Sequence, residues 1–273
     1  MRTMNGREYS LCLLDTNIVS EILKSQTTLG KKFVVYSLAQ KAIPCISIWT
    51  ILELRKASEL YKKFLEFFSV MPFFLIKDPT QIFNNEIDCY PDSSKVDPLQ
   101  WAFTYINDDP RGKLNNFMDE LFNFPAVREA ENLWGGKWRE DALKSILSLK
   151  PNFKPKGNYY TARDAIRFLQ EGVPQYVITQ RPEWFKMLLE NDKAIDINAF
   201  PSVKSSFYSV FYRFYAENRT PELQDVFDIL ITNVTPYMDI VITEKFQAEI
   251  FKKVKRRDKS FFHLDIETVK MLR

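Results

Sequence analysis

Short apolar runs alternate with segments of helical periodicity near both ends of the chain. The runs have the length of buried strands and cover residues 10–14, 43–48, 71–78, 239–243 and 260–266. Apolar residues recur at helical spacing over residues 17–23, 29–41, 49–71, 203–218, 220–233 and 245–257. Such alternation is typical of a parallel sheet covered by helices. We therefore predict an α/β fold, a three-layer α/β/α sandwich with a central parallel sheet.

The middle of the chain has a different pattern. From about residue 79 to about residue 196 it is mostly helical, with long loops and the breakers LWGGKW and PNFKPKGNYY. This change predicts a helical insertion in the α/β domain. The expected organisation is a first part of the domain at 1–78, a helical insertion at 79–199 and a second part at 200–273.

Composition excludes several classes of function. The 273 residues include seven glycines, and the chain contains neither GxGxxG nor GxxxxGK[ST], so a glycine-rich phosphate loop is not expected. The net charge of +3 is too small to indicate nucleic-acid binding by itself. A single histidine, His263, argues against histidine-based catalysis. Cys12, Cys45 and Cys89 lie far apart, which favours reduced thiols in a cytoplasmic protein. Neither a signal peptide nor a membrane span is expected.

Carboxylates remain as carriers of chemistry, and five of them lie where a parallel sheet binds ligands. Such sheets bind ligands beyond the carboxyl ends of their strands. Asp15 follows the first predicted strand, Glu53 lies in the first turn after the second, and Glu244 follows the strand at 239–243. Asp225 and Asp228 lie three residues apart near the start of the helix that leads into the strand at 239–243, so they share one helix face. A solvated surface is the structural interpretation of that face. Clustered carboxylates repel one another unless a cation lies among them, and Mg²⁺ or Mn²⁺ suits such oxygen ligands.

Each acid after a strand also has a purely structural interpretation. Asp15 is in a position to cap the following helix. Glu53 completes a possible capping box with Thr50. Glu244 suits the positive end of a helix as an ordinary first-turn acid. Asp239 lies at the other end of its strand, and we interpret it as structural.

Four segments together resemble the PIN-domain nucleases, in particular the larger PIN-like proteins of prokaryotes. They are LLDTN at 13–17, SIWTILELRKA at 47–57, DVFDILI at 225–231 and IVITEKF at 240–246. The resemblance covers about residues 10–78 and 200–273. The chain is about twice the size of the family's small toxins, carries Glu where the fourth acid is more often Asp, and offers two acids at the third motif.

The resemblance implies a role for each matching residue. The metal-binding acids would be Asp15, Glu53, Asp225 and Glu244, with Asp228 as a competitor for the third position. Two further residues, Asn17 and Thr243, would orient these acids through hydrogen bonds.

The function implied is that of a Mg²⁺- or Mn²⁺-dependent endoribonuclease of the cytoplasm. Its substrate would be RNA, single-stranded or structured, and hydrolysis would need no covalent enzyme intermediate. A toxin or defence effector restrained by a neutralising protein partner would be its setting; homo-oligomer formation stays open. Two alternatives remain: a non-catalytic nucleic-acid-binding or scaffold protein, and a structure-specific DNA nuclease.

Three other features fit both a functional and a structural interpretation. The basic run at 252–259 suits either a phosphate backbone or a solvated helix end. The aromatic segment at 207–215 suits base stacking, but at helical spacing it is more typical of a core. Trp134 and Trp138 either line a cleft or anchor the inserted helices, and we favour anchoring.

Overall fold

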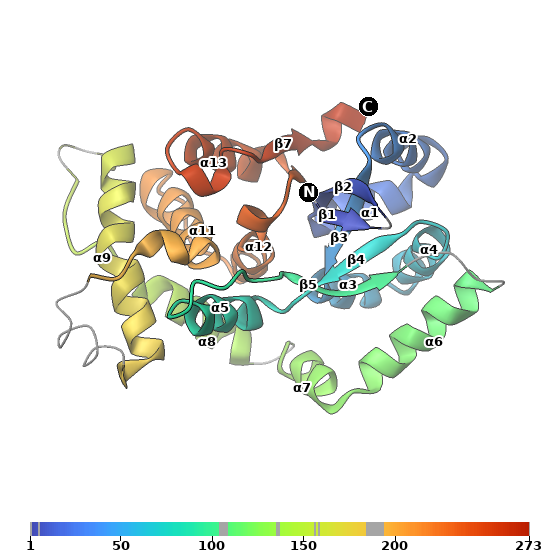
Figure 1. Cartoon of the computed structure of the whole chain (residues 1–273), viewed down its shortest axis with the longest axis horizontal. Coiled ribbons are helices and arrows are strands. Elements are labelled where there is room, and N and C mark those ends of the chain that lie inside the picture. Colours follow the sequence, from blue (N-terminus) through green and yellow to red (C-terminus); the bar gives the residue numbers. More distant parts are fainter. Residues whose placement is uncertain are drawn as a thin grey trace. The chain divides into compact units, whose positions relative to one another are not determined.

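The computed structural model describes residues 2–4, 6–103, 109–134, 137–155, 157, 159–183 and 194–272 (Figure 1). Within it the chain forms two compact units. Unit 1 comprises residues 1–78, 98–139 and 237–273, and unit 2 comprises residues 79–97 and 140–236. These units do not coincide with the three ranges expected from sequence. Residues 98–139 belong with the sheet, and residues 200–236 belong with the helical unit.

Unit 1 is built on a mostly parallel sheet of seven strands. The strands are β1 (Arg2–Met4), β2 (Arg7–Leu14), β3 (Ala42–Ser47), β4 (Phe73–Ile76), β5 (Leu99–Phe103), β6 (Ile240–Thr243) and β7 (Asp265–Thr268). Their order is β5-β4-β3-β2-β6-β7, and β1 pairs with β2. Strands β2, β3, β4, β6 and β7 pair in parallel, whereas β1 and β5 pair antiparallel. The α/β class with a mostly parallel central sheet is therefore confirmed.

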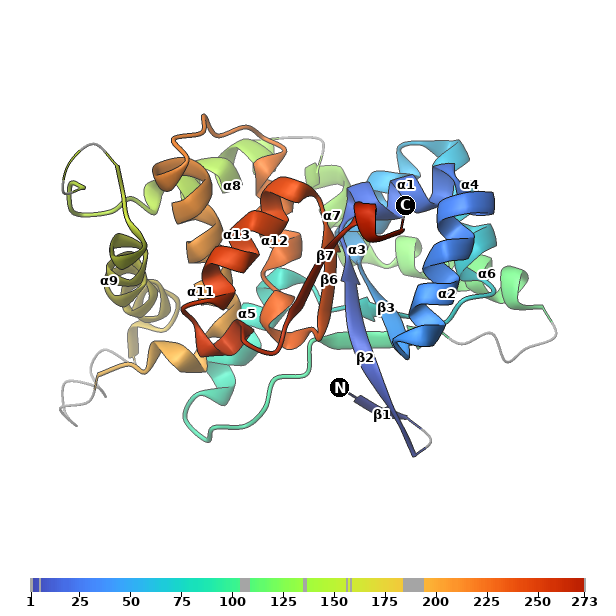
Figure 2. The ribbon, with the colours of Figure 1, turned by 90° about the horizontal axis from the view of Figure 1, so that it is seen from above.

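Helices cover both faces of this sheet. They are α1 (Thr16–Lys24), α2 (Lys31–Ala39), α3 (Ile48–Arg55), α4 (Ser58–Phe68), α6 (Pro110–Asn123), α7 (Pro125–Trp134) and α13 (Lys245–Lys255). Figures 1 and 2 show α13 on one face and α1, α2 and α4 on the other. The crossovers from β2 to β3 and from β6 to β7 run in opposite directions along the sheet. Because parallel crossovers are right-handed, their helices fall on opposite faces.

The buried strands carry continuous apolar sequence, as strands covered on both faces should. Every residue of β3, β4 and β6 is buried. In β2 only the last four residues are buried, and these run into Asp15. The core of unit 1 therefore surrounds the carboxyl half of β2.

Unit 2 is helical. Its elements are α5 (Pro79–Cys89), α8 (Lys137–Ser148, beginning in unit 1), α9 (Ala162–Gln180), α11 (Pro201–Val210), the π-helical η3 (Phe211–Ala216) and α12 (Asp225–Thr232). The ring of Phe168 on α9 packs on those of Phe207 and Phe211, with centroids 5.3 and 5.5 Å apart. The aromatic segment at 207–215 is thus largely core, the interpretation that its helical spacing favoured.

Three expected elements differ in the structure. The long helix at 49–71 is two helices, α3 and α4, separated at Lys56 and Ala57. The strand expected at 260–266 is misplaced along the chain. A 3₁₀ turn (Lys259–Phe261) comes first, and β7 begins at Asp265. His263 lies exposed between them. The helix expected from residue 220 begins at Asp225.

Candidate functional site

Strands β2 and β6 define the point at which the connections of the sheet diverge. The chain leaves β2 toward β3 and β4, and it leaves β6 toward β7 on the other side. Crevices at such switch points, outside the carboxyl ends of the strands, are where open α/β sheets bind ligands. Asp15 and Glu244 directly follow these two strands, and the N–H of Asp15 donates to the carbonyl of Ile242 at 3.3 Å. The structure therefore brings the first and the last predicted acid together.

The carboxylate of Asp15 joins α1 to the end of β6. Its Oδ1 accepts the N–H groups of Asn17 (2.7 Å) and Ile18 (3.3 Å), so Asp15 caps α1, as its structural interpretation required. Its Oδ2 accepts the Thr243 hydroxyl (2.5 Å) and the Glu244 N–H (3.3 Å). Thr243 thus orients Asp15, as the resemblance implied. Asn17 contacts Asp15 through its backbone N–H, in the capping bond to Oδ1.

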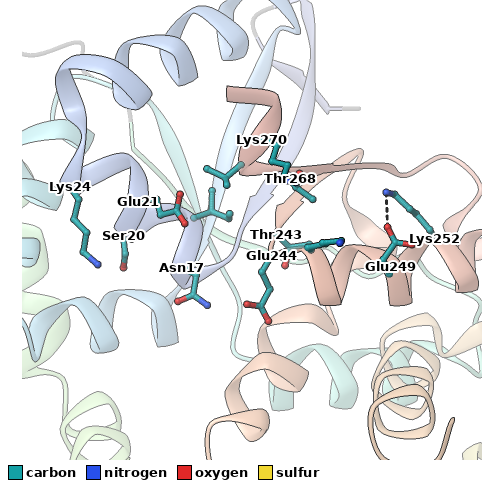
Figure 3. A pocket seen from close by; sticks show the side chains of 13 residues that line it. Asn17, Ser20, Glu21, Lys24, Thr243, Glu244, Glu249, Lys252, Thr268 and Lys270 are labelled. Atoms are coloured by element: carbon teal, nitrogen blue, oxygen red, sulfur yellow. Dashed lines mark hydrogen bonds and ion pairs between the residues drawn. The ribbon is translucent and has the colours of Figure 1, made fainter. Parts of the chain in front are cut away.

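Glu244 occupies the N-cap position of α13, but its side chain does not cap that helix. The residue is extended (φ −67°, ψ 160°), and its carboxylate accepts no capping bond from α13. It therefore precedes the first turn, and the interpretation as an ordinary first-turn acid is wrong. The side chain is partly exposed and lines a pocket of about 560 Å³. Figure 3 shows the Asn17 and Glu244 side chains extending in the same direction from α1 and from the end of β6.

Glu53 lies farther along its helix than the sequence suggested. Ser47 is the N-cap of α3, and its hydroxyl accepts the N–H of Trp49 at 3.2 Å. Thr50 is thus inside the helix, so Glu53 belongs neither to a capping box nor to the first turn. The hydroxyl of Thr50 lies 3.1 Å from that of Thr16, next to Asp15. Because residues three apart share a helix face, Glu53 is carried on the face of α3 that meets the start of α1.

Two cations lie within electrostatic reach of Glu53. Burial lowers the pKa of Arg139, and the negative charge of Glu53 opposes that shift. Burial and Arg139 lower the pKa of Lys56, again opposed by Glu53. The ring of Trp138 stacks on that of Trp49, with centroids 5.6 Å apart and planes at 11°. Trp138 therefore anchors the segment that carries Arg139, while the side chain of Trp134 lies outside the described residues.

The pocket beside Glu244 includes residues that sequence reasoning missed. Its lining comes from α1, from the end of β6 and from α13, and from the end of β7 with the segment after it. The residues are Asn17, Ile18, Ser20, Glu21, Lys24, Thr243, Glu244, Lys245, Glu249, Lys252, Thr268, Val269 and Lys270. On α1 the spacing of Asn17, Glu21 and Lys24 follows one polar helix face, opposite the buried Val19 and Leu23. That face is visible in the sequence. The contribution after β7 is not, because the last strand was misplaced.

Asp225 and Asp228 lie in unit 2 and bind arginine there. Asp225 is fully buried; its Oδ1 accepts a hydrogen bond from Arg213 Nη1 at 2.7 Å and forms an ion pair with Arg219 Nη2 at 3.0 Å. Its Oδ2 accepts the N–H of Glu222 at 2.8 Å. The partly exposed Asp228 also accepts Arg213 Nη1, at 3.0 Å. These contacts give Asp225 an ion-pair role within unit 2; its assignment as a metal ligand stays a prediction.

The other structural expectation that the contacts address concerns Asp239. Its Oδ2 accepts the N–H of Leu11 at 2.8 Å, which ties the start of β6 to β2. Asp239 is thus structural, as expected. In the part of the chain that the structure describes, no three or more Asp, Glu, His or Cys side chains are grouped so as to hold a metal ion.

Unit 1 is therefore an α/β unit with two acids and a pocket at its switch point. No family model, curated protein or solved structure matches the chain. No helix within the described ranges is long and apolar enough to cross a membrane.

Proposed function

We propose that the chain is a Mg²⁺- or Mn²⁺-dependent endoribonuclease whose site lies at the carboxyl ends of β2 and β6. The observation that carries this proposal is the meeting of Asp15 and Glu244 on neighbouring parallel strands, beside a pocket. The resemblance of their sequence segments to PIN-domain nucleases supports the choice of reaction, and the setting as a toxin or defence effector rests on that resemblance alone.

The donor set at the switch point suits a hard divalent cation. Mg²⁺ is commonly held by one or two carboxylates, with waters and substrate phosphates completing its shell, so a cluster of three acids is not required. The carboxylate of Glu244 does not cap α13 and lines the pocket. Asp15 has two long bonds, both 3.3 Å, whose donors a cation would displace most easily. When bound, the metal would activate water and stabilise the charge that develops on the phosphate.

The protein's own groups prepare this site. Thr243 donates to Asp15 and fixes the orientation of its carboxylate. Helices α1 and α13 both begin at this site, and the positive ends of their dipoles favour a phosphate nearby. Glu53 is the third candidate acid, and the cations Arg139 and Lys56 lie within electrostatic reach of it. Asp225 is left out of the proposed ligand set because arginines already surround its carboxylate.

The test is cleavage of labelled RNA with Mn²⁺, with and without EDTA. Asp15→Asn and Glu244→Gln should reduce the rate by more than the about 10–100-fold that follows loss of a group that only orients a ligand. Glu59→Gln, at an exposed position of α4, is the matched control and should cleave like the wild type. Cleavage that persists in EDTA or in both site variants would refute the mechanism.

Two further arms separate the alternatives. Single-stranded and branched DNA in the same assay would be cleaved in preference to RNA by a DNA nuclease. Binding of nucleic acid without cleavage of any substrate would instead indicate a non-catalytic binding protein.

A further inference from the structure

The pocket beside Glu244 gathers lysines from three separate elements. Lys24 comes from α1, Lys252 from α13 and Lys270 from the 3₁₀ segment Val269–Leu272 (Figure 3). Lys245, the first residue of α13, is the fourth. Lys252 forms an ion pair with Glu249 at 3.1 Å. The other three take part in no ion pair with any residue that the structure describes. Their ammonium groups are therefore available to an anion.

The rest of the lining shows what kind of anion suits the pocket. Hydroxyl and amide groups accompany the lysines, from Asn17, Ser20, Thr243 and Thr268, and so do the carboxylates of Glu21, Glu244 and Glu249. No aromatic side chain is among the described lining residues. Proteins that bind single strands hold bases by stacking them on aromatic rings and hold phosphates with cations. This pocket has cations for phosphates and no aromatic rings for bases, so its chemistry suits phosphate and sugar groups.

We propose that the pocket binds the phosphate backbone of single-stranded RNA next to the cleavage site, without reading its bases. This inference rests on the proposed function for the identity of the substrate. The volume of about 560 Å³ is that of a site for a drug-sized ligand, so we expect the pocket to hold a short stretch of one strand. The positions of Glu244 and Lys245, adjacent in sequence, place a proposed metal ligand at the edge of the phosphate-binding surface.

The test measures binding in EDTA, so that no cleavage is needed. Fluorescein-labelled U-only and A-only RNA strands of about 12 nucleotides are titrated with protein while anisotropy is recorded at several salt concentrations. The two strands should bind with similar affinity. Each lysine that contacts phosphate should contribute about 0.7 to the slope of log K against log salt.

The variant is Lys24→Ala combined with Lys270→Ala, and the matched control is Lys62→Ala, an exposed lysine of α4 that does not line the pocket. The double variant should bind several-fold more weakly and lower the slope by about 1.4, whereas the control should match the wild type. Circular dichroism verifies that both remain folded.

Three results would overturn the inference: an unchanged slope in the double variant, a strong preference for one base, or equally tight binding of a duplex through the same lysines.

The two proposals fail separately. Lysine-dependent binding without Mn²⁺-dependent cleavage sinks the nuclease and leaves the backbone site. Cleavage by the double variant at the wild-type rate and with wild-type affinity sinks the backbone site and leaves the nuclease.

Discussion

Replacing Asp225 by Asn separates a structural role from a catalytic one. The substitution keeps the size of the side chain but removes its charge and one of its two acceptor oxygens, so any loss reports electrostatics and hydrogen bonding and not a cavity. Arg213 and Asp225 are both fully buried, and their atoms lie 2.7 Å apart. Removing one partner of a buried ion pair typically costs about 3–5 kcal/mol, because the remaining charge has no water to solvate it.

The neighbouring contacts set where in that range the effect should fall. Arg213 keeps Asp228 as a partner at 3.0 Å, and Arg219 is 30% exposed and can turn to solvent. We therefore expect about 3 kcal/mol, near the lower limit. Asp228→Asn should cost about 1 kcal/mol or less, because its side chain is 37% exposed. The double variant Arg213→Met, Asp225→Leu should recover much of the loss, since it leaves no buried charge of this pair.

The assay is urea unfolding followed by circular dichroism, fitted to two transitions because the chain has two units. A loss of 3 kcal/mol lowers the midpoint of the affected transition by about 1–3 M. Cleavage of RNA is measured on the same samples. If Asp225→Asn unfolds like the wild type but loses Mn²⁺-dependent cleavage, the ion-pair argument is wrong and Asp225 is the metal ligand that the sequence suggested.

Three further outcomes are expected. Thr243→Val removes a buried hydroxyl bonded to the charged Asp15 and should cost about 2 kcal/mol in urea unfolding; an unchanged midpoint would show that the bond contributes nothing. Burial raises the pKa of Tyr61 from 10.0 to about 12, so the stability that this group contributes is present below pH 10 and is lost as pH rises toward 12. Tyr61→Phe should flatten that decline in the free energy of unfolding. An equally steep decline in the variant and the wild type would refute this. Burial also raises the pKa of the Cys12 thiol, so a thiol reagent should modify the partly exposed Cys89 first in native protein, and equal rates would contradict it.

The sequence predicted the strands that are buried along their whole length, because such strands form continuous apolar runs. Strands β3, β4 and β6 are buried throughout, and each appeared as an apolar run close to its observed bounds. Strand β5 was missed because it is an edge strand with three consecutive exposed residues. Strand β7 was shifted because Phe262, which suggested a strand, is 53% exposed in a turn.

The acids divide in a similar way. Asp15 and Glu244 each follow a buried strand, and the pairing of β2 with β6 then sets their proximity across 229 residues of sequence. Glu53 was predicted on the correct helix but in the wrong turn. The N–H of Trp49 donates to Ser47, so the helix begins earlier than expected and Glu53 lies beyond its first turn. The partners of Asp225 could not be predicted, because Arg213 and Arg219 meet it through tertiary packing and not through a sequence motif.

This division indicates which part of a motif-based assignment carries weight. An acid that directly follows a strand inherits its position from the register of the sheet, so two such acids on adjacent parallel strands must share one edge. An acid on a helix outside the sheet inherits its position from side-chain packing, and there a cation from the chain itself can satisfy it. Arg213 does so for Asp225. For this chain the switch-point pair, Asp15 and Glu244, is therefore the part of the predicted site to test first, and Asp225 is the part whose role depends on the stability measurement.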